Sequence, residues 1–291
     1  MRVLKWEIDL LNVFRFNYFL YGIFVGFPIK QPYGLYLFLI FWIVLSGYGI
    51  TAGAHRLWSH RSYEAKLPLK IFLAFCNTIA FQRSIYKWCK IHRSHHQFVD
   101  TNADPHNSRR GLFFSHFGWM LIKPHQDVEK FGQKINLRDL ENDKIVMFQH
   151  KNYPILILFC AFLLPISILK SWNISFHHAL NMVLICHFII SNLIWLVNSY
   201  AHKFGSKPYN KKISATDSSY FAIIVLGEGF HNFHHVFPYD YRTSEYNLYW
   251  CNSTTLFIDL MTRIGWASNL KTVSTNTIRK SYLQIKGENH H

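Results

Sequence analysis

Apolar residues gather in four stretches of the chain that are long enough to cross a lipid bilayer. They run from Leu11 to Ile29, Gly34 to Ala54, Tyr153 to Leu169 and Ala179 to Tyr200. Their lengths are close to the roughly 20 residues that a spanning helix needs. A short turn joins the first pair and another joins the second pair, so the pattern predicts two hairpins. We therefore expect an all-α membrane protein with four transmembrane helices (residues 11–29, 34–54, 153–169 and 179–200).

Two further apolar runs, Leu67 to Phe81 and Tyr220 to Leu226, are too short or too interrupted to span. They are expected to form helices that lie against the membrane face or in the aqueous part of the protein. The chain shows no internal repeat, so we expect a single domain over residues 1–291. Its segments 55–152 and 203–291 then pack together as one helical domain outside the bilayer.

The distribution of Lys and Arg predicts how the spans are oriented across the membrane. Of 31 Lys and Arg residues, only Lys30 and Lys170 fall in the two hairpin turns, and the positive-inside rule places the basic segments in the cytosol. Both termini and the helical domain are therefore predicted to be cytosolic. No cleavable signal is apparent, and Asn173 in the second turn fits a glycosylation motif but lies very close to the membrane.

Histidine dominates the candidate chemistry. The five cysteines form no CxxC pair, which argues against a thiolate site, whereas the 18 histidines include three clusters. These clusters are His55 with His60; His92 with His95 and His96; and His231 with His234 and His235. Asn198 and His202 lie four residues apart at the end of the last span.

Spacings of three and four residues place side chains on one face of a helix, so the second and third clusters can each direct imidazoles toward one point. The spacing of five between His55 and His60 favours a turn over a continuous helix. With His202, the clusters make nine candidate ligands, which is more than one metal can use, so the pattern predicts two metal ions bound by imidazole. The remaining histidines are isolated and are expected to be ordinary polar residues; these are His106, His116, His125, His150, His177, His178, His187, His290 and His291.

Together with the run Asp-Pro-His-Asn from Asp104 and the stretch Phe113 to Trp119, the histidine clusters resemble the membrane acyl-CoA desaturases of the stearoyl-CoA type. The resemblance covers about Gly49 to Arg263. It implies a non-haem centre of two iron ions, with nine histidine ligands and one Asn that reaches a metal through water. The matching positions are His55, His60, His92, His95, His96, His202, His231, His234 and His235, together with Asn198.

The same resemblance implies the reaction and its partners. Family enzymes use dioxygen and two electrons from cytochrome b5, reduced by its reductase, to place a cis double bond in a saturated long-chain fatty acyl-CoA. We expect the bond at or near carbons 9 and 10, a location in the endoplasmic reticulum membrane, and membrane lipid but no nucleic acid as a further partner. Glu228 is a candidate to orient a histidine ligand by contacting it on the side away from the metal.

The resemblance also implies which residues contact the substrate. Residues at the bend of the family's acyl tunnel match Gln82, Trp88 and Trp195, although the two Trp also suit an interfacial aromatic belt. Arg83, Lys87, Lys90 and Lys123 lie near positions that hold the CoA phosphates, and a solvated basic face is the alternative.

Four departures affect these contacts. Ile194 replaces a Thr at the bend, Ile91 replaces an Asp, Lys90 replaces an Arg, and Pro124 replaces a second basic residue. They leave open the bond position and the chain length. The alternatives to a desaturase are a membrane di-iron hydroxylase or acetylenase and a catalytically silent relative, although no predicted ligand is missing.

Overall fold

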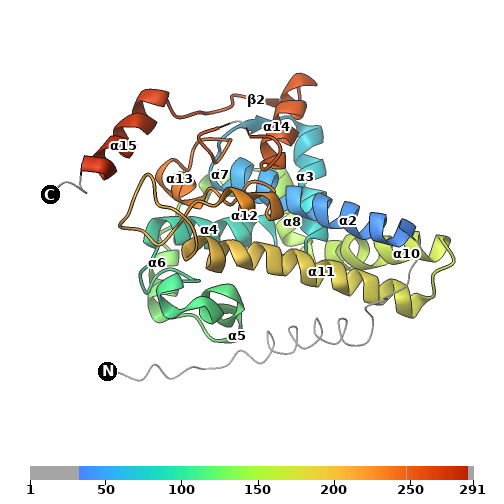
Figure 1. Ribbon diagram of the computed structural model, residues 1–291. Helices are drawn as coiled ribbons and strands as arrows, with labels where there is room; N and C mark the ends of the chain where they lie inside the picture. Colours follow the sequence, from blue (N-terminus) through green and yellow to red (C-terminus); the bar gives the residue numbers. More distant parts are fainter. Residues whose placement is uncertain (1–32, 247, 288–291) are drawn as a thin grey trace.

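The computed structural model describes residues 33–246 and 248–287, and it is mostly helical (Figure 1). In this part of the chain, three helical runs are long and apolar enough to cross a membrane: Tyr33–Ser59, Tyr153–Ser171 and Phe176–His202. Large apolar side chains on these runs, such as Phe41 and Phe159, are more than half exposed, as expected for surfaces that face lipid. The predicted helical membrane fold is therefore confirmed, whereas the predicted first span, residues 11–29, lies outside the described residues.

The described residues form α-helices, short π- and 3₁₀-helices (η) and one two-stranded sheet. The elements in the first half of the described chain are α2 (Tyr33–Tyr48), η1 (Gly49–Ser59), β1 (Glu64–Ala65), α3 (Leu67–Ile79), α4 (Ile85–Phe98), η2 (Ser108–Arg110), η3 (Phe114–Gly118), α5 (Trp119–Leu121), α6 (Gln126–Gly132), α7 (Arg138–Glu141) and α8 (Lys144–Lys151). Those in the second half are α9 (Tyr153–Leu156), η4 (Ile157–Leu163), α10 (Leu164–Ser171), α11 (Phe176–Ser199), η5 (Tyr200–His202), α12 (Ser219–Ile224), α13 (His231–Val236), α14 (Ser253–Arg263), β2 (Ala267–Ser268) and α15 (Thr275–Gly287).

The second predicted hairpin is present. The continuous run α9–η4–α10 leads into a turn at residues 172–175, and α11 returns beside it (Figure 1). The Ser175 hydroxyl accepts a hydrogen bond from the His178 N–H and caps the start of α11, which satisfies one of the free N–H groups of that helix end. Ile166 and Leu169 of α10 share a buried apolar cluster with Met182 of α11.

The run that begins with α2 is longer than predicted. The predicted span ended at Ala54, whereas helical backbone continues through the π-helix η1 to Ser59. Helix α3 packs against η1 at Gly49, where an added Cβ would lie only 2.2 Å from the Asn77 backbone N. This close approach requires glycine. Helix α3 is the predicted short apolar helix of residues 67–81, and α12 is the one of residues 220–226.

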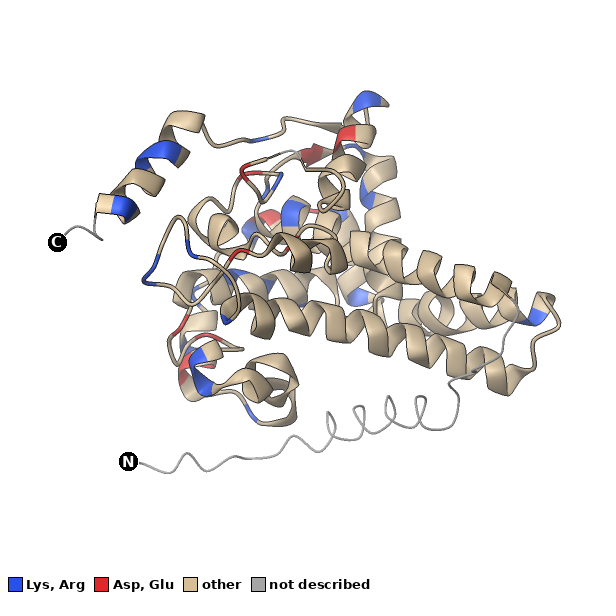
Figure 2. Ribbon diagram, in the orientation of Figure 1, with Lys and Arg blue, Asp and Glu red and all other residues tan. Residues whose placement is uncertain are grey.

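A polar domain covers the end of the spans opposite the turn at residues 172–175. Lys and Arg residues lie mainly on this domain (Figure 2). Its interior contains an apolar cluster that includes Leu73 of α3, Cys89 of α4 and Ile258 of α14. The strands β1 and β2 pair antiparallel, which joins the start of α3 to the end of α14.

Candidate metal centre

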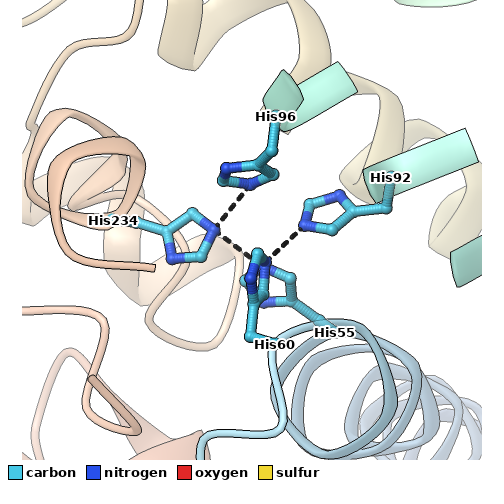
Figure 3. A group of neighbouring side chains, drawn as sticks. All are labelled: His55, His60, His92, His96 and His234. Atoms are coloured by element: carbon cyan, nitrogen blue, oxygen red, sulfur yellow. Dashed lines mark hydrogen bonds between the residues drawn. The ribbon is translucent and has the colours of Figure 1, made fainter. Parts of the chain in front are cut away.

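The histidines singled out by the sequence converge at the junction between the spans and the polar domain. They form two groups within which the ligand nitrogens lie within 4.8 Å of one another. The first group (Figure 3) is His55, His60, His92, His96 and His234. The second group is His95, His202, His231 and His235.

The π-helix η1 explains the spacing of five between His55 and His60. The His60 backbone N–H donates to the His55 carbonyl oxygen at 3.1 Å, which is the i to i+5 pattern of a π-turn. The prediction of a simple turn was therefore wrong for His55, which lies inside a helix, while His60 is the residue that ends it. The wider helical turn places both imidazoles in the first group.

The clusters on α4 and α13 do not each converge on one point, as the sequence analysis expected. On α4, His92 and His96 join the first group and His95 joins the second. On α13, His234 joins the first group and His231 and His235 join the second. Successive residues of a helix project about 100° apart, so adjacent histidines point to either side, and these two short helices serve both groups.

The spacing of the Nε2 atoms fits two metal ions. In the first group, His55 to His234 is 2.9 Å, His60 to His92 is 2.8 Å and His96 to His234 is 3.0 Å. In the second, His202 to His231 is 3.0 Å, His231 to His235 is 3.1 Å and His95 to His235 is 3.3 Å. Two nitrogens at right angles around one ion, each about 2.1 Å from it, lie about 3.0 Å apart. The donor set and its geometry therefore suit cations held by imidazole.

Burial disfavours the charged form of seven of these imidazoles. Desolvation lowers the pKa of His92, His96, His234 and His235 well below the usual value, and neighbouring histidines lower it further. Neutral imidazole is the form that binds a metal. At neutral pH, these neutral imidazoles can therefore bind metal cations.

Glu228 stands behind the first group. Its Oε2 lies 3.0 Å from His55 Nδ1, and its Oε1 accepts hydrogen bonds from Arg56, whose guanidinium is fully buried. Burial alone would raise the pKa of Glu228, but the nearby Arg56 and His55 lower it to about 2. Gly227 precedes it with a φ of 110°, and a Cβ there would lie 2.1 Å from Asn252 Oδ1, an atom that also binds Arg56. The predicted position of Glu228 behind a histidine is the one observed.

Two other acceptors stand behind the second group. Asp104 Oδ1 lies 2.9 Å from His95 Nδ1, and Ser214 Oγ lies 2.7 Å from His202 Nδ1. An acceptor at Nδ1 holds the proton on that nitrogen and leaves the lone pair on Nε2 for a metal. Asn198 lines the adjacent pocket with His95 and His231, and its contact with a metal through water remains a prediction.

An apolar pocket extends from the histidines along α11. Its lining residues are Gly47, Ile50, Thr51, Ile190, Leu193, Ile194, Val197, Ile224, Val225 and Leu226, with His55, Trp88, His92, His95, Asn198, Glu228 and His231. A second pocket shares Trp88, His92, Ile194 and Asn198 with the first. The two pockets therefore adjoin beside the histidine groups.

The second pocket gathers most of the predicted substrate residues. Gln82, Arg83, Trp88 and Trp195 all line it, and Gln82 Nε2 donates to Ser191 Oγ at 2.6 Å. Two departure positions, Ile91 and Ile194, line it as well. Neither pocket is lined by Lys90 or Lys123, so their contact with a substrate stays a prediction.

Sequence reasoning did not assign His106 or Asp104 a place in the site. His106 was assigned to the isolated histidines, yet its ring centroid lies 4.3 Å from that of His95, and its Nδ1 lies 3.7 Å from Asp104 Oδ1. The signal was the Asp-Pro-His-Asn run, which places both residues on one turn after α4. His187, in contrast, packs between Phe81 and Phe162 as expected.

Comparisons with known proteins identify relatives of this chain. The family model described as fatty acid desaturase matches residues 32–252. The chain is 46% identical over 281 residues to an acyl-CoA Delta-9 desaturase of Acheta domesticus, covering 96% of this chain and 78% of that protein. It is 47% identical to the stearoyl-CoA desaturase of Homo sapiens (84% and 68% covered) and 46% identical to an acyl-CoA Delta-12 desaturase of Tribolium castaneum (87% and 74% covered). The chain therefore belongs to the fatty acid desaturase family.

Proposed function

We propose that this protein is an acyl-CoA desaturase that inserts a cis double bond, at or near carbons 9 and 10, into a saturated long-chain fatty acyl-CoA. The observation that carries the proposal is the position of the two histidine groups beside an apolar pocket that follows a membrane-spanning helix. The names of the relatives support the substrate class.

Two iron ions are the cofactor that we assign to the histidine groups. Bound there, they would supply the strong oxidant needed to remove hydrogen from an unactivated methylene, using dioxygen. All nine histidines are buried or half-buried, and two groups of four and five ligands correspond to one ion each. Electrons are proposed to come from cytochrome b5 and its reductase.

The chain's own residues bind and orient the substrate. A saturated acyl chain offers no polar group by which one methylene pair could be chosen, so shape must select it. The apolar pocket excludes water from the acyl chain, and Trp88 and Ile194, which line both pockets, lie where the chain would pass the histidines. Gln82 is fixed by its hydrogen bond to Ser191 of α11.

We assign the CoA phosphates to the basic residues at the outer end of this path. Arg83 lines the second pocket, and Lys87 is exposed one helical turn further along the chain. Cationic side chains attract phosphate. Lys90 and Lys123 are retained as more distant candidates in the same proposal.

The location proposed is the endoplasmic reticulum membrane, with both termini in the cytosol. The runs Tyr33–Ser59 and Phe176–His202 both end at the histidine groups, and the turn at residues 172–175 marks the opposite side. Most Lys and Arg lie on the histidine side (Figure 2), which supports a cytosolic position for that side.

The test is expression in yeast that lacks its own acyl-CoA desaturase, together with a matched cytochrome b5. Double bonds in the extracted fatty acids are located by mass spectrometry, and His96→Ala serves as the inactive control. We expect a new monoene with the wild-type chain alone. A hydroxylated product, or no product from expressed and iron-loaded protein, would contradict the proposal.

A further inference from the structure

A buried acidic turn lies behind the second histidine group. It follows α4 directly and includes Asp100 and Asp104, which are 8% and 3% exposed. Asp104 accepts the backbone N–H groups of Asp100 at 3.2 Å and His106 at 3.1 Å, while its Oδ1 lies 2.9 Å from His95 Nδ1. The same carboxylate thus shapes the turn and contacts a histidine of the second group.

Asp100 reaches another histidine of that group through a hydroxyl. Its Oδ1 accepts the Ser214 hydroxyl at 2.5 Å, its Oδ2 accepts the Ser214 backbone N–H at 2.8 Å, and Ser214 Oγ lies 2.7 Å from His202 Nδ1. Asp100 adopts a φ of 64°, a left-handed conformation that is uncommon for residues other than glycine. The backbone is therefore held in a less favourable conformation where this carboxylate meets Ser214.

The hydrogen-bond directions in this chain of contacts fix the tautomer of His202. A serine hydroxyl has one proton, and Ser214 donates it to Asp100 Oδ1. Ser214 Oγ must then accept from His202, which places the imidazole proton on Nδ1. The lone pair of His202 is left on Nε2, which faces His231 at 3.0 Å.

We propose that Asp100, acting through Ser214, and Asp104 are positioning residues that orient His202 and His95 and oppose the charge of the cation bound by the second group. The inference rests on the proposed function. Imidazole and the Asn198 amide carry no charge, so carboxylates behind the ligands supply the negative charge. The first group has Glu228 in this role, and the second has two carboxylates.

The experiment compares variants along this chain of contacts in the purified, full-length protein, loaded with iron in detergent. Ser214→Ala removes the hydroxyl, Asp100→Asn removes the charge, and Ser214→Thr keeps a hydroxyl. Asp143→Asn is the matched control, because Asp143 is also a largely buried carboxylate but pairs with Lys70 and Trp58. Iron per chain is measured directly, and iron affinity by competition with a chelator.

We expect about two irons per chain in wild type, Asp143→Asn and Ser214→Thr. Ser214→Ala and Asp100→Asn should each weaken one of the two sites about 10- to 100-fold, the usual effect of removing such a contact, and leave the other unchanged. The double variant should lose less affinity than the sum of the two single losses, because both changes break the same chain of contacts and only the charge of Asp100 is lost in addition.

Unchanged affinity at both sites in Ser214→Ala would overturn the inference, as would equal weakening of both sites or an additive loss in the double variant. If Asp100→Asn does not fold, the comparison of Ser214→Ala with Ser214→Thr decides alone. A wild-type chain that binds fewer than two irons would overturn the proposed function, and this inference with it.

Discussion

The histidine groups and the pocket beside them are positioned by different forces. In the described chain, three histidines of the two groups have an oxygen atom within 3.0 Å of Nδ1: Glu228 for His55, Asp104 for His95 and Ser214 for His202. Away from the histidines, the walls of the pocket are mainly apolar side chains that are held by packing. Hydrogen bonds impose distance and direction, whereas packing tolerates exchanges of similar volume. Changes at the histidines should therefore abolish the reaction, and changes at the pocket should alter its product.

The largest expected effect comes from removing one histidine of either group. His96→Ala and His235→Ala should abolish turnover and lower iron content, because each deletes a nitrogen from a group of five or four. His187→Ala is the control, since His187 is also fully buried but contacts Phe81 and Phe162 instead. Iron analysis and product formation measure the outcome, and equal iron in all three variants would contradict the assignment of ligands.

Arg56→Met should have the next largest effect, on folding. Arg56 donates to Glu228, to Asn252 Oδ1 and to Thr255 Oγ1 within the protein interior. Its removal leaves the charge of Glu228 buried without its cationic partner, which typically costs about 3–5 kcal/mol. Unfolding in detergent is the measurement, and the double variant with Glu228→Gln should recover part of the loss. A single variant as stable as wild type would show that this pair does not support the first group.

A pocket variant should change the product and leave the metal in place. Ile194 lines both pockets, and Ile194→Thr introduces a hydroxyl where the acyl chain would pass. We expect a shift in double-bond position or chain-length preference with full iron content, measured by mass spectrometry of the fatty acids. Ile189→Thr is the matched control, because Ile189 is on the same helix but packs in the apolar cluster between the spans. Identical product ratios in all three proteins would show that Ile194 does not determine the double-bond position or the chain length.

The sequence indicated the histidine groups more clearly than the pocket, because ligand residues leave a pattern in the sequence and packed apolar walls do not. Imidazole ligands recur at helical spacings, so the nine residues were recognisable one by one. Their division between the groups was not, because it depends on the directions in which His95 and His96 project. The π-turn at His55 was also missed, since its hydrogen bonds leave no composition signal. The supporting role of Asp100 requires residue 214 to lie beside it, a contact between residues 114 positions apart that only the folded chain reveals.

The smallest expected effect concerns α13, the helix that contributes to both groups. Asp217 Oδ1 accepts the backbone N–H groups of Asn232 at 2.6 Å and Phe233 at 3.1 Å. Burial raises the pKa of Asp217 from 3.8 to about 7, despite these hydrogen bonds. The folded chain then binds the Asp217 proton more tightly than the unfolded chain between these pH values, so this residue makes stability fall as pH rises from about 4 to about 7.

Asp217→Asn isolates that contribution, because the amide oxygen can still accept both N–H groups while the side chain no longer titrates. We expect the variant to lose part of the decline in stability between pH 5 and about 7, measured by thermal unfolding in detergent at several pH values. Iron content at pH 7 should stay at the wild-type level. A variant whose pH profile matches wild type would show that Asp217 titrates in its ordinary range.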